Sequence, residues 1–351
     1  MKMKQRIIIS KCIESELTEE IANCNPDRFF IITDDITYKL CLPFIIDFEC
    51  LNGATTIKIG STDTYKNINT LMQVWKELGD NGATRHSCIV NLGGGMVTDL
   101  GGFAASTFKR GINFINIPTT LLAMVDASVG GKTGINFNGL KNEIGVFNES
   151  KAVIICAEFL KTLDKQNICS GYAEMLKHSL ISNDNMWSEL INFDILEPDY
   201  GKLQNMIADS IKVKENIVEK DPFETGIRKA LNLGHTIGHA FEAFSLKENR
   251  PLLHGYAVAF GLICELYLSC IKTNFPVEKM RQTVNYIKEN YGTFLFTCKD
   301  YNALINIMKH DKKNTGDTIN FTLLGGIGDI RINQTATKEE LFEALDFFRE
   351  G

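Results

Sequence analysis

The 351-residue sequence predicts an α/β protein whose first half is built on a parallel β-sheet and whose second half is mostly helical. Short apolar runs alternate with helical patterns through the first half, which is typical of strands joined by crossover helices. Beyond about residue 158 the β-branched runs largely stop, and apolar residues recur at the helical spacing of three and four positions. We therefore expect a Rossmann-like domain over residues 1–158 and a mostly helical domain over residues 159–351.

The expected elements follow in chain order. Six apolar runs are predicted as strands, and they are RIIIS (6–10), FFIIT (29–33), TTIKI (55–59), CIVNL (88–92), FINIP (114–118) and AVIIC (152–156). An amphipathic helix is expected over residues 68–82, between the third and fourth runs. In the second half, helices are expected over residues 173–181, 203–218 and 339–348. A strand pair is expected at 320–330, where Gly-Gly and Gly-Asp steps suit tight turns.

Composition excludes several classes of protein. The chain carries 37 basic and 43 acidic residues, a net charge of −6, which argues against a surface built to attract nucleic acid. The first ten residues lack the apolar core of a secretory signal, and no stretch approaches the roughly 20 uninterrupted apolar residues of a membrane span. The ten cysteines are scattered singly and are expected to be reduced, mostly buried thiols. We expect a cytoplasmic protein that binds neither nucleic acid nor a membrane.

The first chemical motif lies at residues 91–111, where a predicted strand ends at Gly93, Gly94 and Gly95 and a helix containing Asp99 follows. Consecutive glycines let backbone N–H groups approach a pyrophosphate, and the dipole of the following helix favours negative charge. The segment lacks the GxGxxG spacing of the dinucleotide fingerprint, and a glycine triplet can also be a packing turn. Taken alone, it leaves both interpretations open.

The segment 114–136 strengthens the nucleotide interpretation. A predicted strand leads into Thr119 and Thr120, followed by Asp126 and by a Gly-Gly-Lys step that ends at Lys132. The two hydroxyls and the second glycine pair suit hydrogen bonds to phosphate or ribose, and the lysine suits an anionic group of a substrate. The alternative is a surface loop with a solvated lysine.

A metal site is predicted in the helical half. His235 and His239 are four residues apart, which places both imidazoles on one face of a helix, and His254 follows shortly after. Such a pair can also be structural or solvated. Two neutral imidazoles and one carboxylate would form a catalytic metal site with positions open to substrate. Glu174 is a candidate for the carboxylate, although spacing alone does not choose it among the other acidic residues.

Six blocks of the sequence, in this order, resemble the signature of the 3-dehydroquinate synthase family within the sugar phosphate cyclases. They are GGGMVTDLGGF (93–103), RGINFINIPTTLLAMVDASVGGKTGIN (110–136), LKNEIGVF (140–147), SGYAEMLKH (170–178), LNLGHTIGHA (231–240) and LLHGYAVAFG (252–261). The resemblance implies a divalent metal, zinc or cobalt, that is held by Glu174, His235 and His254. It also implies that His239 lies next to the substrate and is not a ligand.

The same resemblance implies the remaining site residues. Those expected around the substrate are Asp126, Lys132, Lys141, Asn142, Lys177, Lys214, Arg228, Asn232, His239 and Lys312, which is preferred to Lys313. Each basic residue, taken alone, is more often a solvated surface charge. Those expected to bind NAD are Asp34, Asp63, Lys66, Gly94, Gly95, Asp99, Thr119, Thr120, Leu122, Asp126, Lys132, Lys141, Phe159, Thr162 and Leu163. Arg110 is expected to reach the site of a neighbouring subunit, which implies a homodimer.

Three segments depart from the pattern of the family. Asp63 and Lys66 stand where Gly-Glu-x-x-Lys is common, Asn167 stands where a glutamate is usual, and Tyr256 stands where HGEAVA is the commoner block. These changes bear on nucleotide affinity and on the surroundings of the site. They leave the expected metal and substrate residues intact.

The substrate that the resemblance implies is 3-deoxy-D-arabino-heptulosonate 7-phosphate, whose carboxylate and phosphate would explain why an acidic protein gathers cations in a cleft between its domains. In the implied cycle NAD oxidises an alcohol, phosphate is eliminated, the hydride returns, and the ring opens and closes as an aldol. The alternatives are another sugar phosphate cyclase, a metal-dependent alcohol dehydrogenase that would release NADH, and a nucleotide-binding regulator without the chemistry.

Overall fold

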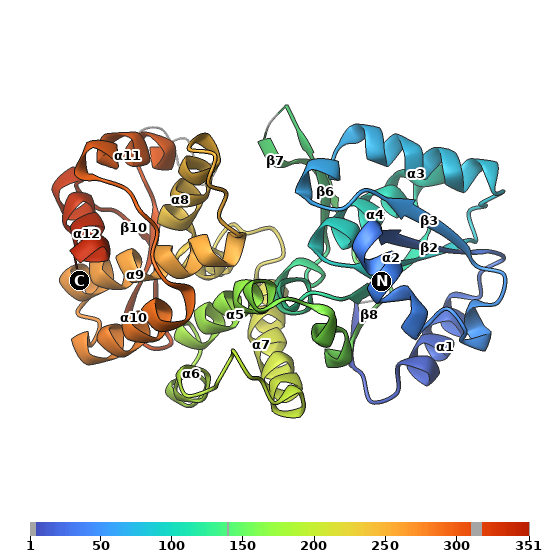
Figure 1. Ribbon diagram of the computed structural model, residues 1–351, viewed down its shortest axis with the longest axis horizontal. Coiled ribbons are helices and arrows are strands. Elements are labelled where there is room, and N and C mark those ends of the chain that lie inside the picture. The colour runs from blue at the N-terminus through green and yellow to red at the C-terminus, as the bar shows by residue number, and fades with distance from the viewer. Residues whose placement is uncertain (1–4, 139, 310–317, 351) are drawn as a thin grey trace. The chain divides into compact units, whose positions relative to one another are not determined.

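The computed structural model describes residues 5–138, 140–309 and 318–350, and the chain divides into two compact units. Unit 1 comprises Met1–Asp164 and Asp199–Ile211, and unit 2 comprises Lys165–Pro198 and Lys212–Gly351 (Figure 1). Helix α7 (Tyr200–Lys220) therefore contributes its first half to unit 1 and its second half to unit 2. The division expected after residue 158 differs from this one in where it places residues 159–164 and 199–211.

Unit 1 is built on a six-stranded parallel sheet in the order β1-β8-β5-β4-β2-β3. Its strands are β1 (Arg6–Ile9), β2 (Phe29–Asp34), β3 (Thr55–Ile59), β4 (Cys88–Gly93), β5 (Asn113–Pro118) and β8 (Ala152–Ile155). The six predicted runs form these six strands, so the predicted parallel sheet is confirmed. Strands β4 and β8 are buried at every position, as expected for a parallel sheet that is covered on both faces.

The helices of unit 1 begin where strands end. They are α1 (Ile13–Cys24), α2 (Asp35–Leu40), α3 (Ile68–Asp80) and α4 (Gly95–Thr107), and α3 confirms the helix expected at 68–82. Strand β2 continues to β3 on one side of the sheet, whereas β4 continues to β5 on the other. The direction of winding therefore reverses between β2 and β4. Open α/β sheets bind ligands at the carboxyl ends of the strands at such a reversal.

A two-stranded antiparallel hairpin of β6 (Lys132–Phe137) and β7 (Leu140–Phe147) follows, in a region where no strand was predicted from the sequence. Strand β7 is exposed along its length, so it lacks the half-buried alternation by which strands are recognised. The two strands meet at glycines, because a Cβ atom on Gly145 would lie 2.1 Å from the carbonyl oxygen of Thr133.

Unit 2 is organised around helix α9 (His254–Thr273). Around it pack α5 (Lys165–Leu180), α8 (His235–Lys247), α10 (Val277–Tyr291), α12 (Lys338–Glu350) and the predicted hairpin of β9 (Phe321–Gly326) and β10 (Asp329–Gln334). Helices α6 (Asp184–Ile191) and α11 (Tyr301–Lys309) complete the unit. Within the described residues α9 alone is long and apolar enough to cross a membrane, but 72% of its most apolar window is buried inside the protein. Its apolar character is therefore explained by packing.

The cysteines are all free thiols, but the expectation that most are buried is wrong. Only Cys41, Cys88, Cys169 and Cys264 are buried, and Cys12 and Cys298 are exposed. Four of the six exposed or half-buried thiols, those of Cys12, Cys24, Cys156 and Cys298, lie at or next to the ends of helical segments.

Candidate active site

Glycines bring three helices of unit 2 into close contact. A Cβ atom on Gly238 of α8 would lie 2.7 Å from the carbonyl oxygen of Ala257, and one on Gly261 of α9 would lie 2.0 Å from that of Gly234. At the start of α9, a Cβ atom on Gly255 would lie 1.8 Å from the carbonyl oxygen of Ser170 in α5. These contacts allow side chains from α5, α8 and α9 to meet.

Glu174 of α5, His235 of α8 and His254 of α9 meet at this point. The Oε1 atom of Glu174 lies 3.3 Å from His235 Nε2 and 3.5 Å from His254 Nε2. It is fully buried and accepts no hydrogen bond. Two ligand atoms on a tetrahedral zinc ion are roughly 3.4 Å apart, given bond lengths of about 2.0–2.1 Å. The separations therefore match those of ligands to a single cation.

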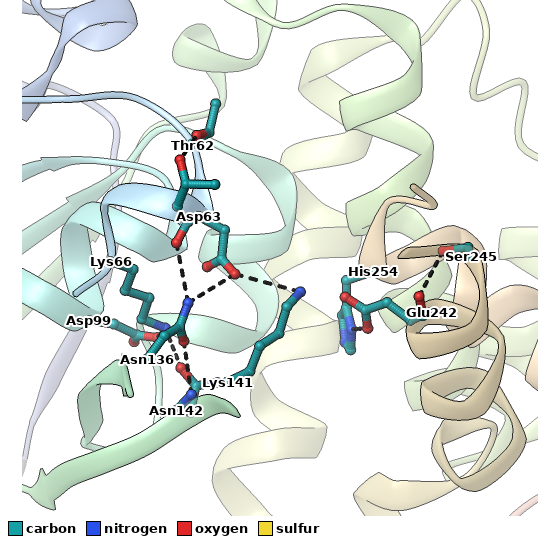
Figure 2. Close-up of polar contacts among 11 residues, drawn as sticks. Thr62, Asp63, Lys66, Asp99, Asn136, Lys141, Asn142, Glu242, Ser245 and His254 are labelled. Atoms are coloured by element: carbon teal, nitrogen blue, oxygen red, sulfur yellow. Dashed lines mark hydrogen bonds and ion pairs between the residues drawn. The ribbon is translucent and has the colours of Figure 1, made fainter. Parts of the chain in front are cut away.

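The other nitrogens of the two imidazoles have partners that fix the tautomers. His235 Nδ1 lies 3.1 Å from the carbonyl oxygen of Leu233, which can only accept, so Nδ1 donates and Nε2 keeps its lone pair. His254 Nδ1 lies 3.1 Å from Glu242 Oε2, and this carboxylate has the same effect (Figure 2). Two nitrogen lone pairs and a carboxylate oxygen therefore point at one position, which is a donor set that suits a divalent cation.

The charges around this position attract a cation. Burial alone would raise the pKa of Glu174, but the Lys177 ammonium and the His235 imidazole hold it well below its usual range. Burial alone would lower the pKa of His254, whereas the carboxylates of Glu174 and Glu242 raise it to about 10. The Glu174 carboxylate thus stays ionised, and His254 attracts a proton when no other cation is present.

His239 lies in the same group as His235 and His254. Its ring centroid is 5.3 Å from that of His235 and 5.8 Å from that of His254, and ligand atoms of the three histidines lie within 4.8 Å of one another. A three-histidine set is therefore sterically possible beside the set that includes Glu174. The choice between them stays a prediction.

Replacing Glu242 by glutamine is expected to lower metal affinity by about 10–100-fold, the usual cost of losing a group that orients a ligating imidazole. Glutamine can donate its amide N–H to His254 Nδ1, which would favour the tautomer that lacks a lone pair on Nε2. Titration of the metal-free protein with Zn²⁺ in competition with a chelator measures this. Wild-type affinity in Glu242→Gln would contradict the role.

In unit 1, residues expected to bind a nucleotide gather at the reversal of the sheet. Strand β2 ends at Asp34 and β4 ends at Gly93, and Gly94 precedes the first turn of α4 without any side-chain cap. A Cβ atom on Gly94 would lie 3.0 Å from Cγ2 of Thr120, so a side chain there would fill the space above the helix N–H groups. The backbone is thus open to a pyrophosphate, which fits the expected dinucleotide.

A second polar cluster links this region to the β6–β7 hairpin (Figure 2). Lys66 is buried, and its ammonium donates to the carboxylate of Asp99 and to the side-chain oxygen of Asn142. Asn136 donates from Nδ2 to Asp63 Oδ2 at 3.1 Å. One cluster thus contains Asn136, which was not predicted as a site residue, and four residues that were predicted for NAD or for the substrate, Asp63, Lys66, Asp99 and Asn142.

Asp63 also connects to the hairpin through Lys141, whose Nζ atom lies 3.6 Å from Asp63 Oδ2 (Figure 2). Both side chains are about half exposed, at 50% and 48%, so solvent screens this pair and it contributes little to stability. Little stability would therefore be lost if the Lys141 ammonium turned from Asp63 to another anion.

The remaining predicted residues of unit 1 lie close to the same strands. Thr119 and Thr120 follow β5, Leu122 and Asp126 lie in or next to a π-helical turn (Ala123–Ala127), and Lys132 begins β6. Phe159, Thr162 and Leu163 belong to the turn Ala157–Thr162 and its end, which the Thr162 hydroxyl joins to Cys41 Sγ at 3.7 Å. Buried Gln5 was not predicted as a site residue, although its Oε1 accepts from the N–H of Gly130 at 3.2 Å and fixes the Gly-Gly-Lys step.

The predicted cations of unit 2 are buried. Lys177 is 1% exposed and donates to Glu174 Oε2, and Lys214 and Arg228 are 5% and 2% exposed. Asn232 donates from Nδ2 to Glu224 Oε1 at 3.0 Å. Lys312 falls outside the described residues. The structure thus groups Glu174, Lys177, His235, His239 and His254.

Asp221 orders the loop that leads to Arg228. Its carboxylate accepts from the backbone N–H groups of Thr225 at 3.0 Å, Gly226 at 2.7 Å and Arg228 at 3.0 Å. Burial alone would raise the pKa of Asp221, but these hydrogen bonds lower it from 3.8 to about 2. The N–H groups of the loop therefore stabilise the ionised form of Asp221. The ionised carboxylate in turn stabilises the conformation of the loop.

This shift predicts how stability depends on pH. Because the folded pKa is depressed, Asp221 contributes stability above the unfolded pKa, and the contribution is lost as pH falls through the folded pKa. We expect Asp221→Asn to unfold at a lower urea concentration than wild type at pH 6, and the difference to shrink between pH 4 and pH 2. Urea unfolding of both proteins across that range measures this. A difference that does not change with pH would refute the assignment.

Comparisons with known proteins show the family to which the chain belongs. Residues 56–170 match the model of the N-terminal part of 3-dehydroquinate synthase, and residues 171–314 match that of the C-terminal part. The chain belongs to the 3-dehydroquinate synthase family. A 3-dehydroquinate synthase from Parabacteroides distasonis is 52% identical over 348 residues, which cover 99% of both chains. One from Leptospira interrogans is 39% identical over 91% of this chain and 90% of its own length. The resemblance seen in the sequence is thus confirmed.

Solved structures share the fold at lower identity. A 2-deoxy-scyllo-inosose synthase, solved with carbaglucose-6-phosphate, NAD⁺ and Co²⁺, is 23% identical with a TM-score of 0.85 and covers 98% of this chain and 96% of its own. A 2-epi-5-epi-valiolone synthase from Streptomyces hygroscopicus, with NAD⁺ and Zn²⁺ bound, is 23% identical with a TM-score of 0.83 and covers 100% and 98%. An iron-containing alcohol dehydrogenase from Thermotoga maritima has 12% identity and a TM-score of 0.67 and covers 99% of each chain. At these identities the comparison establishes the fold.

Proposed function

We propose that this chain is a 3-dehydroquinate synthase, which converts 3-deoxy-D-arabino-heptulosonate 7-phosphate to 3-dehydroquinate and phosphate as a carbon–oxygen lyase. The observation that carries the proposal is the buried Glu174 oxygen at 3.3 and 3.5 Å from two imidazole nitrogens whose lone pairs face it, in a chain of this family. A divalent cation held there would polarise the oxygen of an alcohol that is to be oxidised and of the ketone that forms.

Two cofactors are assigned to different residues. We assign NAD to Asp34, Asp63, Lys66, Asp99 and the glycines and threonines that follow β4 and β5, and zinc or cobalt to Glu174, His235 and His254. The open backbone at Gly94 and the lone pairs on the two Nε2 atoms support these assignments. Bound NAD would take up and return a hydride, and a bound divalent cation would polarise the oxygens of the substrate.

The cations bind and orient the substrate. Lys214 and Arg228 are almost fully buried, and Lys132, Lys141 and Lys312, together with the neutral amide of Asn142, complete the set that we assign to its carboxylate and phosphate. Arg228 is preorganised, because its backbone is held by Asp221 and its Nη1 donates to the carbonyl oxygen of Pro222 at 2.6 Å. A fixed guanidinium binds an anion without first losing side-chain freedom. Lys177 acts through Glu174, whose charge it balances.

Proton transfer is assigned to His239, which is partly exposed beside the two proposed ligands. A side chain one turn along the same helix face from His235 reaches the same substrate, which is the geometry that general acid–base catalysis requires. Asp126 and Asn232 are assigned to substrate binding. Arg110, exposed in a left-handed conformation with φ +72°, is assigned to a neighbouring subunit's site in a cytoplasmic homodimer.

Phosphate release from the heptulosonate phosphate, with NAD and Zn²⁺ present and absorbance at 340 nm followed in parallel, tests the proposal. We expect phosphate release without net NADH, and 3-dehydroquinate as the product by mass. Net NADH would indicate an alcohol dehydrogenase. No phosphate release from a protein that binds NAD and metal would refute the substrate and direct the assay to other sugar phosphates.

A further inference from the structure

Helix α8, which begins at His235, has no cap of its own. The first N–H groups of any helix lack partners within the helix and are usually satisfied by the side chain of the preceding residue. Here that residue is Gly234, with φ +77° and no side chain. A Cβ atom on Gly234 would lie 2.8 Å from Leu262 Cγ and 3.0 Å from the carbonyl oxygen of Val258. Close packing against α9 thus excludes a local cap.

The cap comes from α9 itself. The side chain of Glu265 is fully buried, and its Oε2 accepts from the N–H of Gly234 at 2.6 Å. Its Oε1 accepts from the N–H groups of Thr236 at 3.0 Å and Ile237 at 3.2 Å. One carboxylate therefore satisfies three backbone donors at the start of the helix, in the position where the helix dipole favours negative charge.

These contacts connect two proposed metal ligands through one rigid element. His254 is the first residue of α9, and Glu265 lies on the same helix, whereas His235 is the first residue of the helix that Glu265 holds. His235 is flanked by two of the bound N–H groups, those of Gly234 and Thr236. Without the carboxylate the first turn of α8 loses its partners, and His235 loses the backbone position that aims its Nε2 at Glu174.

We propose that Glu265 is a positioning residue for the metal centre: by capping α8 from α9, it fixes His235 relative to His254. The inference rests on the proposed metal site and adds to it a residue that acts on the backbone at the start of α8. It explains why a fully buried carboxylate stands in an otherwise apolar stretch of α9, Phe260–Leu268. Burying a carboxylate is costly unless its hydrogen bonds are made. Without the capping role, an apolar residue of the same size would pack at this position equally well.

The test compares Glu265→Gln with Ser269→Ala as a matched control. Glutamine keeps the shape of the glutamate side chain but has only one acceptor oxygen. Its NH₂ group would face backbone N–H groups, which are also donors and cannot bond to it. Ser269 lies one turn further along α9 and is equally buried; its hydroxyl donates to the backbone carbonyl oxygen of Glu265 at 2.7 Å and accepts from the N–H of Leu324 at 3.1 Å, and neither bond involves the Glu265 carboxylate. Both variants lose buried hydrogen bonds, but only the first disturbs His235.

Metal-free wild type and variants would be titrated with Co²⁺ and Zn²⁺ against a competing chelator, and the visible spectrum of the Co²⁺ form recorded. We expect Glu265→Gln to bind about 10–100-fold more weakly with an altered spectrum, and Ser269→Ala to match wild type in both although it melts earlier. Wild-type affinity and spectrum in Glu265→Gln would overturn the inference. Wild type that binds no metal would instead overturn the proposed metal centre.

A measurement on the wild type covers the case in which Glu265→Gln does not fold. The amides of Gly234, Thr236 and Ile237 should exchange with deuterium as slowly as the middle of α8 in the intact protein. Exchange as fast as that of exposed loops would overturn the inference without any variant. Glu265→Asp, which keeps the charge but shortens the reach, should fall between wild type and Glu265→Gln in metal affinity.

Discussion

Replacing Glu174 by glutamine is expected to abolish turnover and to lower metal affinity by more than the about 10–100-fold that is typical of groups that only support a ligand. The carboxylate supplies the negative charge of the proposed donor set, and its Oε1 atom faces both Nε2 atoms. A neutral amide is a weaker ligand, and its N–H₂ can face the imidazoles in place of the oxygen. Metal content after dialysis and the phosphate-release assay measure the two effects.

Loss of activity alone would not separate a lost ligand from a lost fold. Lys177 is 1% exposed and paired with Glu174, and breaking a buried pair by removing one partner costs about 3–5 kcal/mol. Adding Lys177→Met to Glu174→Gln removes the stranded charge, so the double variant should regain much of the melting temperature while metal binding stays lost. A Glu174→Gln protein that melts as wild type does and still binds Zn²⁺ with wild-type affinity would refute the ligand assignment.

The metal centre shows what sequence spacing can and cannot predict. His235 and His239 share a helix, so their spacing of four residues is enough to place them on one face. Glu174 lies on another helix and reaches the histidines because Gly255 lets α9 approach α5, a contact between segments distant in sequence. Spacing could not select this acid among the others, and only the resemblance to a family named it.

The supporting residues were overlooked although the sequence carries a signal for two of them. Glu242 follows His235 and His239 at helical spacing and therefore lies on the same face, and Glu265 is an acidic residue in an apolar helix. The capping role itself could not be predicted, because it depends on Gly234 having no room for a side chain. The six strands of the sheet were predictable because each coincides with an apolar run, whereas β7, exposed along its length, has no such run.

The division of the three histidines gives the second large effect. His235→Ala and His254→Ala are expected to lose metal and turnover together, because each removes an Nε2 lone pair that faces Glu174 Oε1. His239→Asn is expected to keep wild-type metal affinity and to lower kcat by about 10²–10⁴-fold, the usual contribution of a positioned acid–base group. Zn²⁺ titration and the pH dependence of kcat for the three variants measure this.

Two results would revise the assignment in different directions. If His239→Asn lost metal as His235→Ala does, the three-histidine set, whose ligand atoms lie within 4.8 Å of one another, would be the true metal site and Glu174 a partner of Lys177 alone. If His239→Asn kept metal and its pH–rate profile matched wild type, the proton would be moved by another group. Retained metal with a lost limb of that profile would support both a metal site without His239 and an acid–base role for His239, and would thereby separate the functions of the two histidines on one helix face.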